Sequence, residues 1–215
     1  MDDTLVEIDT ATLKVARHFI VTKGAELGRL GPPKNKAADT MSSMPGMNMP
    51  GMKDTGGHGM EPPKTGDNSC SPTWAQPSAD GSSIYVACNK SSEIVEVNAG
   101  AWQVTRRIPA RAGVYNLTVT HDGTRLLATN KRDQSVSVYD LKSGRELARL
   151  PTKRKVLHGV VVSPDDAYAF VTVEGVGAEP GTVEIIDLKA LKTVARVDVG
   201  AEAAGVDFYK IEPAK

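Results

Sequence analysis

Methionine is concentrated in one part of this 215-residue chain, where six of its seven methionines fall within twenty residues. The surrounding segment, residues 23–69, is rich in Gly, Pro, Ser and Lys and has almost nothing that could form a core. Such a segment has no packing reason to collect thioethers, and soft sulfur donors suit Cu(I) and Ag(I). We therefore expect a Cu(I) site, the alternative being a spacer without a ligand. Its ligands would be Met41, Met44, Met47, Met49, Met52 and Met60, with His58 as a supplementary nitrogen donor.

A second candidate set is spread along the chain, at equivalent places in successive repeats that are described below. Its members are Trp74, Tyr115, Asn116 and His158. Each would lie near the start of the innermost strand of a repeat, at the mouth of a central channel, where it could bind a ligand or cofactor. The alternative is that these side chains only fill the channel and bond to loop backbone.

Several classes of function find no support in the sequence. There is no G-x-S-x-G, no G-x-x-x-x-G-K-[ST], no H-E-x-x-H and no C-x-x-C-H. The 26 basic and 26 acidic residues balance, so bulk attraction to nucleic acid or to an anionic membrane is not indicated. No apolar run is long enough to span a membrane. We expect a binding protein rather than an enzyme, with a metal ion or a protein as its partner.

The elements that position these residues repeat along the chain. The turns Asp80-Gly81, Asp122-Gly123 and Asp165-Asp166 are 42 and 43 residues apart, and each precedes two β-rich stretches. The stretches EIVEVN, SVSVYD and TVEIID alternate apolar and polar residues as half-buried strands do. Four antiparallel strands in about 40 residues is the size of one β-propeller blade. The sequence therefore predicts an all-β propeller.

The period also predicts the borders of the blades. We expect a partial blade of third and fourth strands over 1–22, the disordered insertion over 23–69, complete blades over 70–110, 111–151 and 152–200, and a trailing first strand with a tail over 201–215. This count describes an incomplete arc, completed by further sequence or by a second chain through its open edges. Because the chain opens at a third strand, we expect an upstream portion, with any export signal, outside this sequence.

The repeats resemble the YVTN-type, WD40-like β-propeller family. The first complete blade carries Pro72, Asp80-Gly81, Tyr85-Val86 and Asn89 of that pattern, and the third closes on Val197-Asp198-Val199-Gly200. The family includes surface and periplasmic binding scaffolds, and relatives that carry haem d1 or quinone-type chemistry. The methionine segment resembles the motifs of periplasmic copper-resistance proteins. The resemblances imply an extracytoplasmic propeller with a Cu(I)-binding loop, the alternatives being a protein-interaction scaffold or a fragment of a cofactor-bearing redox propeller.

The two cysteines, Cys70 and Cys88, flank the first hairpin of the first complete blade. A hairpin that turns at Asp80 would bring them together at its open end. We therefore expect a disulfide, which favours a periplasmic or extracellular location, the alternative being two half-buried thiols.

Overall fold

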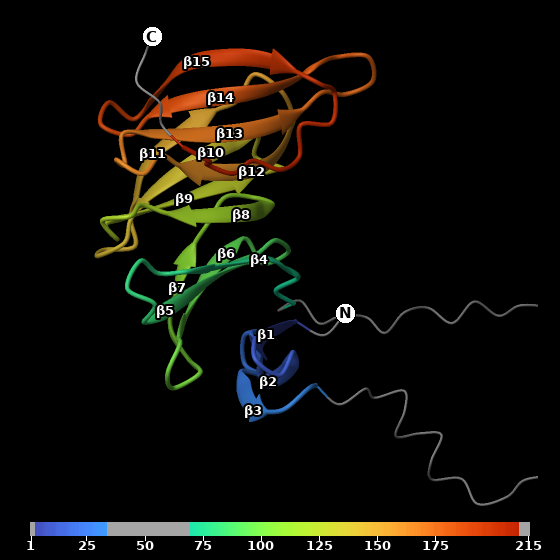
Figure 1. Ribbon diagram of the computed structural model, residues 1–215, viewed down its shortest axis with the longest axis vertical. Coiled ribbons are helices and arrows are strands. Elements are labelled where there is room, and N and C mark those ends of the chain that lie inside the picture. The colour runs from blue at the N-terminus through green and yellow to red at the C-terminus, as the bar shows by residue number, and fades with distance from the viewer. Residues whose placement is uncertain (1–2, 34–68, 211–215) are drawn as a thin grey trace, which may run out of the picture.

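The computed structural model describes residues 3–33 and 69–210, and over these residues the chain is all-β (Figure 1). The first sheet has three strands in the order β1-β2-β3: β1 (Thr4–Asp9), β2 (Lys14–Ile20) and β3 (Leu27–Leu30). The described part of the chain contains no helix that could cross a membrane.

Three sheets of four strands follow, each built from consecutive antiparallel strands. The first comprises β4 (Pro72–Pro77), β5 (Ser83–Cys88), β6 (Glu93–Asn98) and β7 (Gln103–Pro109). The second comprises β8 (Val114–Val119), β9 (Arg125–Asn130), β10 (Ser135–Asp140) and β11 (Glu146–Pro151). The third comprises β12 (Val156–Val162), β13 (Tyr168–Glu174), β14 (Gly181–Asp187) and β15 (Lys192–Val199). We call these sheets the first, second and third blades.

The sheets follow one another as an arc from β1 to β15 (Figure 1). The first strand of the second blade, β8, contacts the first strands β4 and β12 of the blades on either side of it. Three hydrophobic clusters fill the spaces between successive sheets, and the β1–β3 sheet is joined to the first blade through Leu5, Phe19, Val86, Val95 and Trp102. The molecule is thus an incomplete β-propeller, as the sequence predicts.

The turns between first and second strands share one hydrogen-bonding scheme. Asp80, Asp122 and Asp165 each accept a bond from the hydroxyl two residues before them and from the backbone N–H two residues after them. These bonds favour the charged carboxylate and lower the pKa of all three aspartates, to about 2 for Asp80. The scheme explains why Asp recurs at this place in the sequence.

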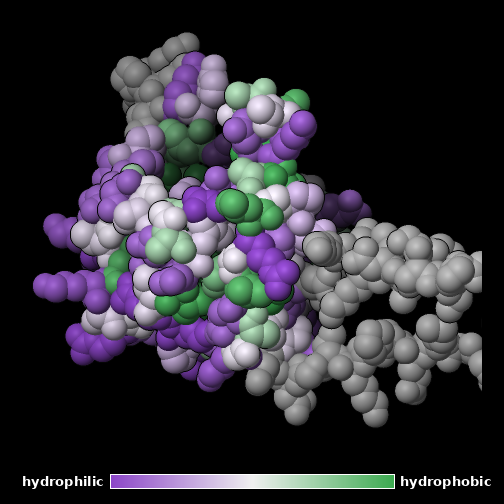
Figure 2. Space-filling view, turned by 90° about the horizontal axis from the view of Figure 1, so that it is seen from below, coloured by the Kyte–Doolittle hydropathy of each residue, from purple (hydrophilic) through white to green (hydrophobic). Residues whose placement is uncertain are grey.

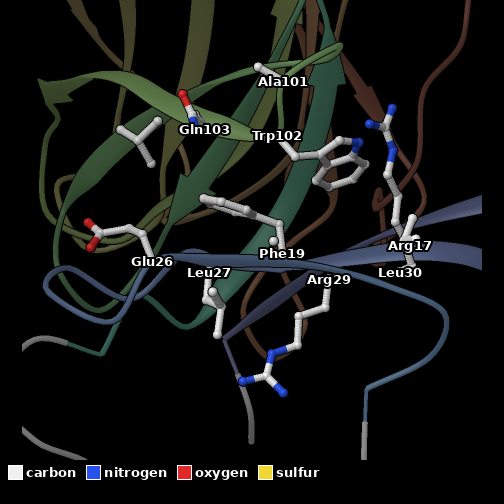
Figure 3. Close-up of a pocket in the computed structure, with 11 residues that line it drawn as sticks. Arg17, Phe19, Glu26, Leu27, Arg29, Leu30, Ala101, Trp102 and Gln103 are labelled. Atoms are coloured by element: carbon white, nitrogen blue, oxygen red, sulfur yellow. The ribbon is translucent and has the colours of Figure 1, made fainter.

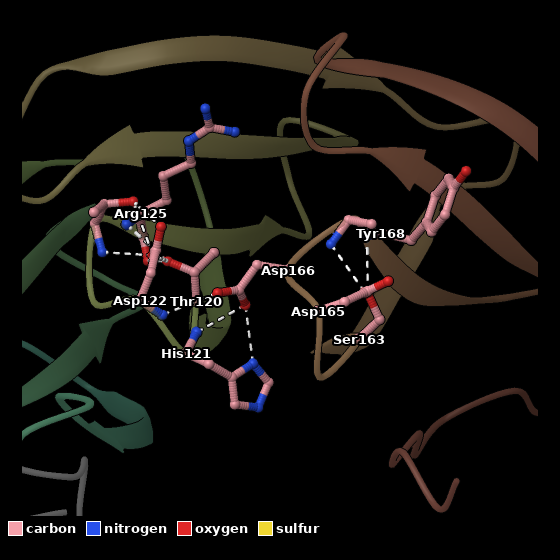
Figure 4. Close-up of polar contacts among 10 residues, drawn as sticks. Thr120, His121, Asp122, Arg125, Ser163, Asp165, Asp166 and Tyr168 are labelled. Atoms are coloured by element: carbon pink, nitrogen blue, oxygen red, sulfur yellow. Dashed lines mark hydrogen bonds and ion pairs between the residues drawn. The ribbon is translucent and has the colours of Figure 1, made fainter. Parts of the chain in front are cut away.

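The next turn position requires a left-handed backbone, which glycine adopts without strain. Gly81 has φ +72° and Gly123 has φ +68°, but the third blade has Asp166 there, at φ +55°. The Asp166 carboxylate accepts the N–H groups of His121 (2.8 Å) and Asp122 (2.9 Å) and lies 2.9 Å from His121 Nδ1 (Figure 4). The residue that departs from the repeat therefore ties the third blade to the second.

Arginines join successive sheets on the same side of the arc. Arg17 donates to the carbonyl oxygens of Ala99 (2.7 Å) and Gly100 (3.0 Å), which follow the third strand of the first blade. Arg106 and Arg125 donate to the equivalent carbonyls, those of Leu141 and Leu188. Each such bond satisfies a turn carbonyl in the neighbouring sheet.

Two expectations about strands were wrong. The predicted irregular insertion over 23–69 begins with a strand, because β3 pairs with β2 as an outer strand of the first sheet. The predicted trailing first strand after 201 forms no strand over the described residues up to 210. Residues 204–208 nevertheless lie beside the third blade, where Ala204 O accepts Gly159 N–H (3.1 Å) and Phe208 meets Phe170 with 6.3 Å between ring centroids.

The predicted disulfide is confirmed, since Cys70 and Cys88 are bonded and both are buried. The segment that the bond holds also anchors the first sheet. Asp3 accepts the N–H groups of Cys70 (2.6 Å) and Ser71 (2.9 Å) and the hydroxyl of Thr22 (2.6 Å). Burial opposes the charge of Asp3, but these hydrogen bonds outweigh it and lower its pKa.

Candidate functional site

Bulges in the first strands position the predicted channel residues. Tyr115 and Asn116 lie opposite the single residue Thr129, and His158 lies in the equivalent bulge of β12, opposite Thr172. A bulge leaves one residue out of the hydrogen-bonding ladder and re-aims its side chain. The local backbone therefore presents Tyr115 and His158 away from the sheets that carry them.

The threonine hydroxyls opposite the bulges also connect the blades. Thr129 Oγ1 accepts Asn116 N–H (3.1 Å) and donates to His158 O in the next blade (3.0 Å). Thr172 Oγ1 does the same with Gly159 N–H (2.9 Å) and Ala204 O (2.7 Å). The spacing of Tyr115 from His158 is thus set by a partly buried hydrogen bond between their two blades.

Tyr115 and His158 meet with two further side chains, which we call the mouth cluster: Tyr115, Lys131, His158 and Glu174. The Tyr115 and His158 rings are 5.4 Å apart in an edge arrangement. Lys131 Nζ lies 3.5 Å from the Tyr115 ring centroid and 3.2 Å from His158 Nε2. Glu174 Oε1 lies 2.7 Å from His158 Nε2. The cluster combines a cation, an imidazole, an aromatic face and one carboxylate.

Burial has the larger of two opposing effects on Lys131. It lowers the pKa of Lys131, while the Glu174 charge acts in the opposite direction. The Lys131 ammonium has three donors, and its described neighbours are the Tyr115 ring and the His158 nitrogens rather than a carboxylate in direct contact. A carboxylate on a ligand could form a charge-assisted hydrogen bond with the Lys131 ammonium. This bond would offset the cost of burying the Lys131 charge.

The other two predicted channel residues are not part of this cluster. Trp74 lies on β4 with 43% of its surface exposed, and it makes no described ring contact with Tyr115 or His158. Asn116 is buried, and its Oδ1 atom has no hydrogen-bond partner among the described residues. The sequence analysis missed Lys131 and Glu174. The repeat would have identified both, because Lys131 and Glu174 are 43 residues apart and occupy the same position at the end of a second strand. Asn89 occupies this position in the first blade.

The predicted metal ligands cannot be placed. The six methionines and His58 lie in 34–68, outside the described residues. Among the residues that are described, no group of three or more His, Cys, Asp or Glu side chains could hold a metal ion.

A hollow of about 650 Å³ lies between the β1–β3 sheet and the start of β7 (Figure 3). Phe19 and Trp102 contribute aromatic rings to its wall, and Arg17 lies 4.5 Å from the Trp102 ring centroid. Trp102 has a left-handed backbone with φ +51°, and its buried Nε1 has no described partner. Gly28 allows this packing, since a Cβ there would lie 3.3 Å from Trp102 Cβ and from its carbonyl oxygen. Among the described residues, the predicted channel residues Trp74, Tyr115, Asn116 and His158 do not line this hollow.

Several solved structures are similar in fold to this chain. Hydrazine synthase of Kuenenia stuttgartiensis matches with a TM-score of 0.58 and 24% identity, over 66% of this chain and 41% of that chain. U3-55K matches with a TM-score of 0.53, 15% identity and coverages of 62% and 40%. The RRP9 WD40 repeats match with a TM-score of 0.53, 16% identity and the same coverages.

The chain therefore spans about two-fifths of each of these solved chains. No protein-family model matches it, and no curated protein is significantly similar in sequence. At this level of identity the likeness concerns the fold alone, since unrelated functions share propellers. The chain has a WD40-like β-propeller fold, in which the mouth cluster lies at one end of the inner strands.

Proposed function

We propose that this protein is a non-enzymatic, extracytoplasmic binding propeller that holds a carboxylate-bearing ligand at its mouth cluster and Cu(I) on its methionine segment. The first part of the proposal is carried by the position of Lys131, a partly buried cation placed against Tyr115 and His158. The buried Cys70–Cys88 bond supports an oxidising compartment such as a periplasm.

The carboxylate is recognised by charge and by donors that converge from two blades. Lys131 and Tyr115 belong to the second blade, and His158 and Glu174 belong to the third. The hydrogen bond from Thr129 to His158 O already fixes the position of the two blades relative to each other. A ligand that contacts both blades would therefore lose little free energy to ordering the protein. An acidic side chain or chain terminus of a protein partner carries the required group.

Nuclear magnetic resonance tests this site with succinate as the probe. Succinate should shift the Tyr115, Lys131 and His158 signals in a saturable manner, while sodium chloride at equal ionic strength should not. Lys131→Met should abolish the shifts, because it keeps the aliphatic stem and removes the charge. Lys142→Met, an exposed lysine in a turn of the second blade, is the matched control. Equal responses in the two variants would reject the site.

The Cu(I) proposal rests on the six clustered methionines. Thioethers are neutral and need no deprotonation, so uptake of Cu(I), or of Ag(I) as its surrogate, should change little with pH. Zn(II), Mg(II) and Ca(II) prefer nitrogen or oxygen donors and should compete poorly. The test compares Ag(I) titration of the protein with a variant in which all six methionines are leucine. Equal uptake by both proteins would eliminate the methionine site.

A further inference from the structure

Each internal junction of the arc joins two kinds of sheet face. We call the face that packs on the following sheet the exit face, and the face that packs on the preceding sheet the entry face. Between the first and second blades, Tyr85 and Ile94 belong to the exit face, and Leu117, Leu126 and Tyr139 belong to the entry face. All five are buried, so an exit face and an entry face together form one continuous core.

The third blade has an exit face that no sheet of the described residues covers. Leu127, Val136 and Val138 of the second blade are fully buried against the third, with Leu150 packed beside them. The equivalent residues of the third blade are also apolar, but Val197 is 52% exposed and the other three are only partly buried. This face consists of Phe170, Val183, Ile185 and Val197.

At the other end of the arc, the entry face of the β1–β3 sheet is not covered by any sheet within residues 3–33 and 69–210. Its residues occupy the repeat positions that Val95, Val97, Trp102 and Val104 fill in the first blade, where they pack on the sheet before. Here Val6 is 43% and Ile8 55% exposed. The face consists of Val6, Ile8, Leu13 and Val15. The view from below, onto this end of the molecule, shows hydrophobic patches among the polar residues (Figure 2).

Residues 204–208 add a structural reason for association. The bond from Thr172 to Ala204 O repeats the bond from Thr129 to His158 O, so this segment occupies the place of a following first strand. By their place in the repeat, β1 and β2 correspond to the third and fourth strands of a blade, and the edge of β1 that faces away from β2 has no strand beside it in the described structure. Among the described residues, one end of the arc thus has a segment in the place of a first strand without the outer strands of its blade, and the other end has outer strands without a first strand.

We infer that the exit face of the third blade binds the entry face of the β1–β3 sheet of a second copy of this chain. Because each copy carries one face of each kind, two copies related by a two-fold axis can cover all four faces in a closed ring. Such a ring has eight sheets, four from each copy, and propellers commonly have about four to eight blades. In each of the two new junctions, residues 204–208 of one copy take the first-strand place of the blade in which β1 and β2 of the other copy are the third and fourth strands.

The oligomeric state in solution tests this inference. The purified chain should have twice the 22.8 kDa mass of one copy in sedimentation or light-scattering measurements. Ile8→Glu places a charge on the entry face and Val197→Glu places one on the exit face, and each should convert the protein to a monomer. Val194→Glu is the matched control, because Val194 and its second-blade equivalent Leu147 are both exposed. Circular dichroism verifies that all variants keep the β fold.

Mixing the two variants distinguishes this interface from other modes of association. The Ile8→Glu chain retains an intact exit face, and the Val197→Glu chain retains an intact entry face. An equimolar mixture should therefore recover a dimer through one junction, at a concentration at least ten times higher than the unsubstituted protein requires.

Four results would overturn the inference. A monomer at all concentrations would indicate that other blades or partners cover these faces. A dimer that survives both substitutions would place the interface elsewhere. A mixture that remains monomeric would exclude an exit-to-entry contact. A series of growing masses would show an open head-to-tail filament instead of a two-copy ring.

Discussion

Equivalent positions in successive blades hold similar residues at one end of the blades and different residues at the other end. At the end with the first-to-second turns, equivalent positions hold equivalent chemistry: a hydroxyl residue, then aspartate, at Ser78 and Asp80 and at the same places in the other blades. At the mouth, equivalent positions hold different side chains. One position is Thr73, Tyr115 and His158 in successive blades, and another is Asn89, Lys131 and Glu174.

This contrast separates what the fold needs from what one site needs. A turn that satisfies its own backbone groups works in every blade and can be repeated. A binding site needs different groups converging on one point, so successive blades must differ there. The blade arrangement at the mouth is still held by repeated groups, because Thr129 and Thr172 make the same bonds behind the variable side chains.

The largest loss of stability is expected when the disulfide at the mouth end is removed. Replacing both Cys70 and Cys88 by alanine should lower the free energy of unfolding by about 2–4 kcal/mol, because the bond closes a loop that the unfolded chain would otherwise explore. Urea denaturation measures this loss. Reduced unsubstituted protein should behave like the double variant, and a loss below about 0.5 kcal/mol would show that the mouth end needs no covalent support.

A smaller loss is expected from the buried hydroxyl behind the mouth cluster. Thr129→Val keeps the shape of the side chain but leaves Asn116 N–H and His158 O without their partner. Unfolding free energy should fall by about 1–3 kcal/mol, and the response of His158 to succinate should weaken with it. Thr105→Val, at an exposed threonine of β7, should change stability by less than about 0.5 kcal/mol. Equal losses in the two variants would contradict a special role for Thr129.

Much of the fold could be predicted because its determinants are local. The predicted period-2 stretches EIVEVN and SVSVYD have the observed bounds of β6 and β10. Residue Leu27 and its neighbours in β3 lie in a Gly-rich stretch without alternation, and they form a strand because β2 offers an edge. Residues 204–208 failed as a strand for the opposite reason, since no second strand is present beside them in the described chain.

The candidate site could be predicted only in part, since it depends on contacts between blades. Counting along the repeat placed Tyr115 and His158 together, and the same count applied to second strands would have found Lys131 and Glu174. Trp74 is at the next position of the repeat, equivalent to Asn116 rather than to Tyr115 and His158, and it makes no described ring contact with those two residues. The link from Asp166 to His121 could not be read from the sequence either, because its partners are 45 and 44 residues away.

The smallest effect is expected at the turn end, and it depends on pH. Hydrogen bonds from Ser78 and Ser82 hold the pKa of Asp80 at about 2, below its ordinary value of 3.8. A folded-state pKa below the unfolded value means that the stabilisation is complete above the unfolded pKa and is lost as the pH falls through the folded one. Acid should therefore weaken the protein progressively from about pH 4 down to about pH 2.

Asp80→Asn isolates this contribution, because asparagine keeps one carbonyl oxygen for the turn but cannot become charged. The variant should have a lower urea midpoint than the unsubstituted protein at neutral pH, and the difference should shrink as the pH approaches 2. Lys131→Met, at the mouth, should leave this acid dependence unchanged, because its charge is constant over that range. If Asp80→Asn and the unsubstituted protein lost stability in parallel down to about pH 2, the carboxylate bonds at this turn would contribute nothing, and the repeated aspartates would serve backbone geometry alone.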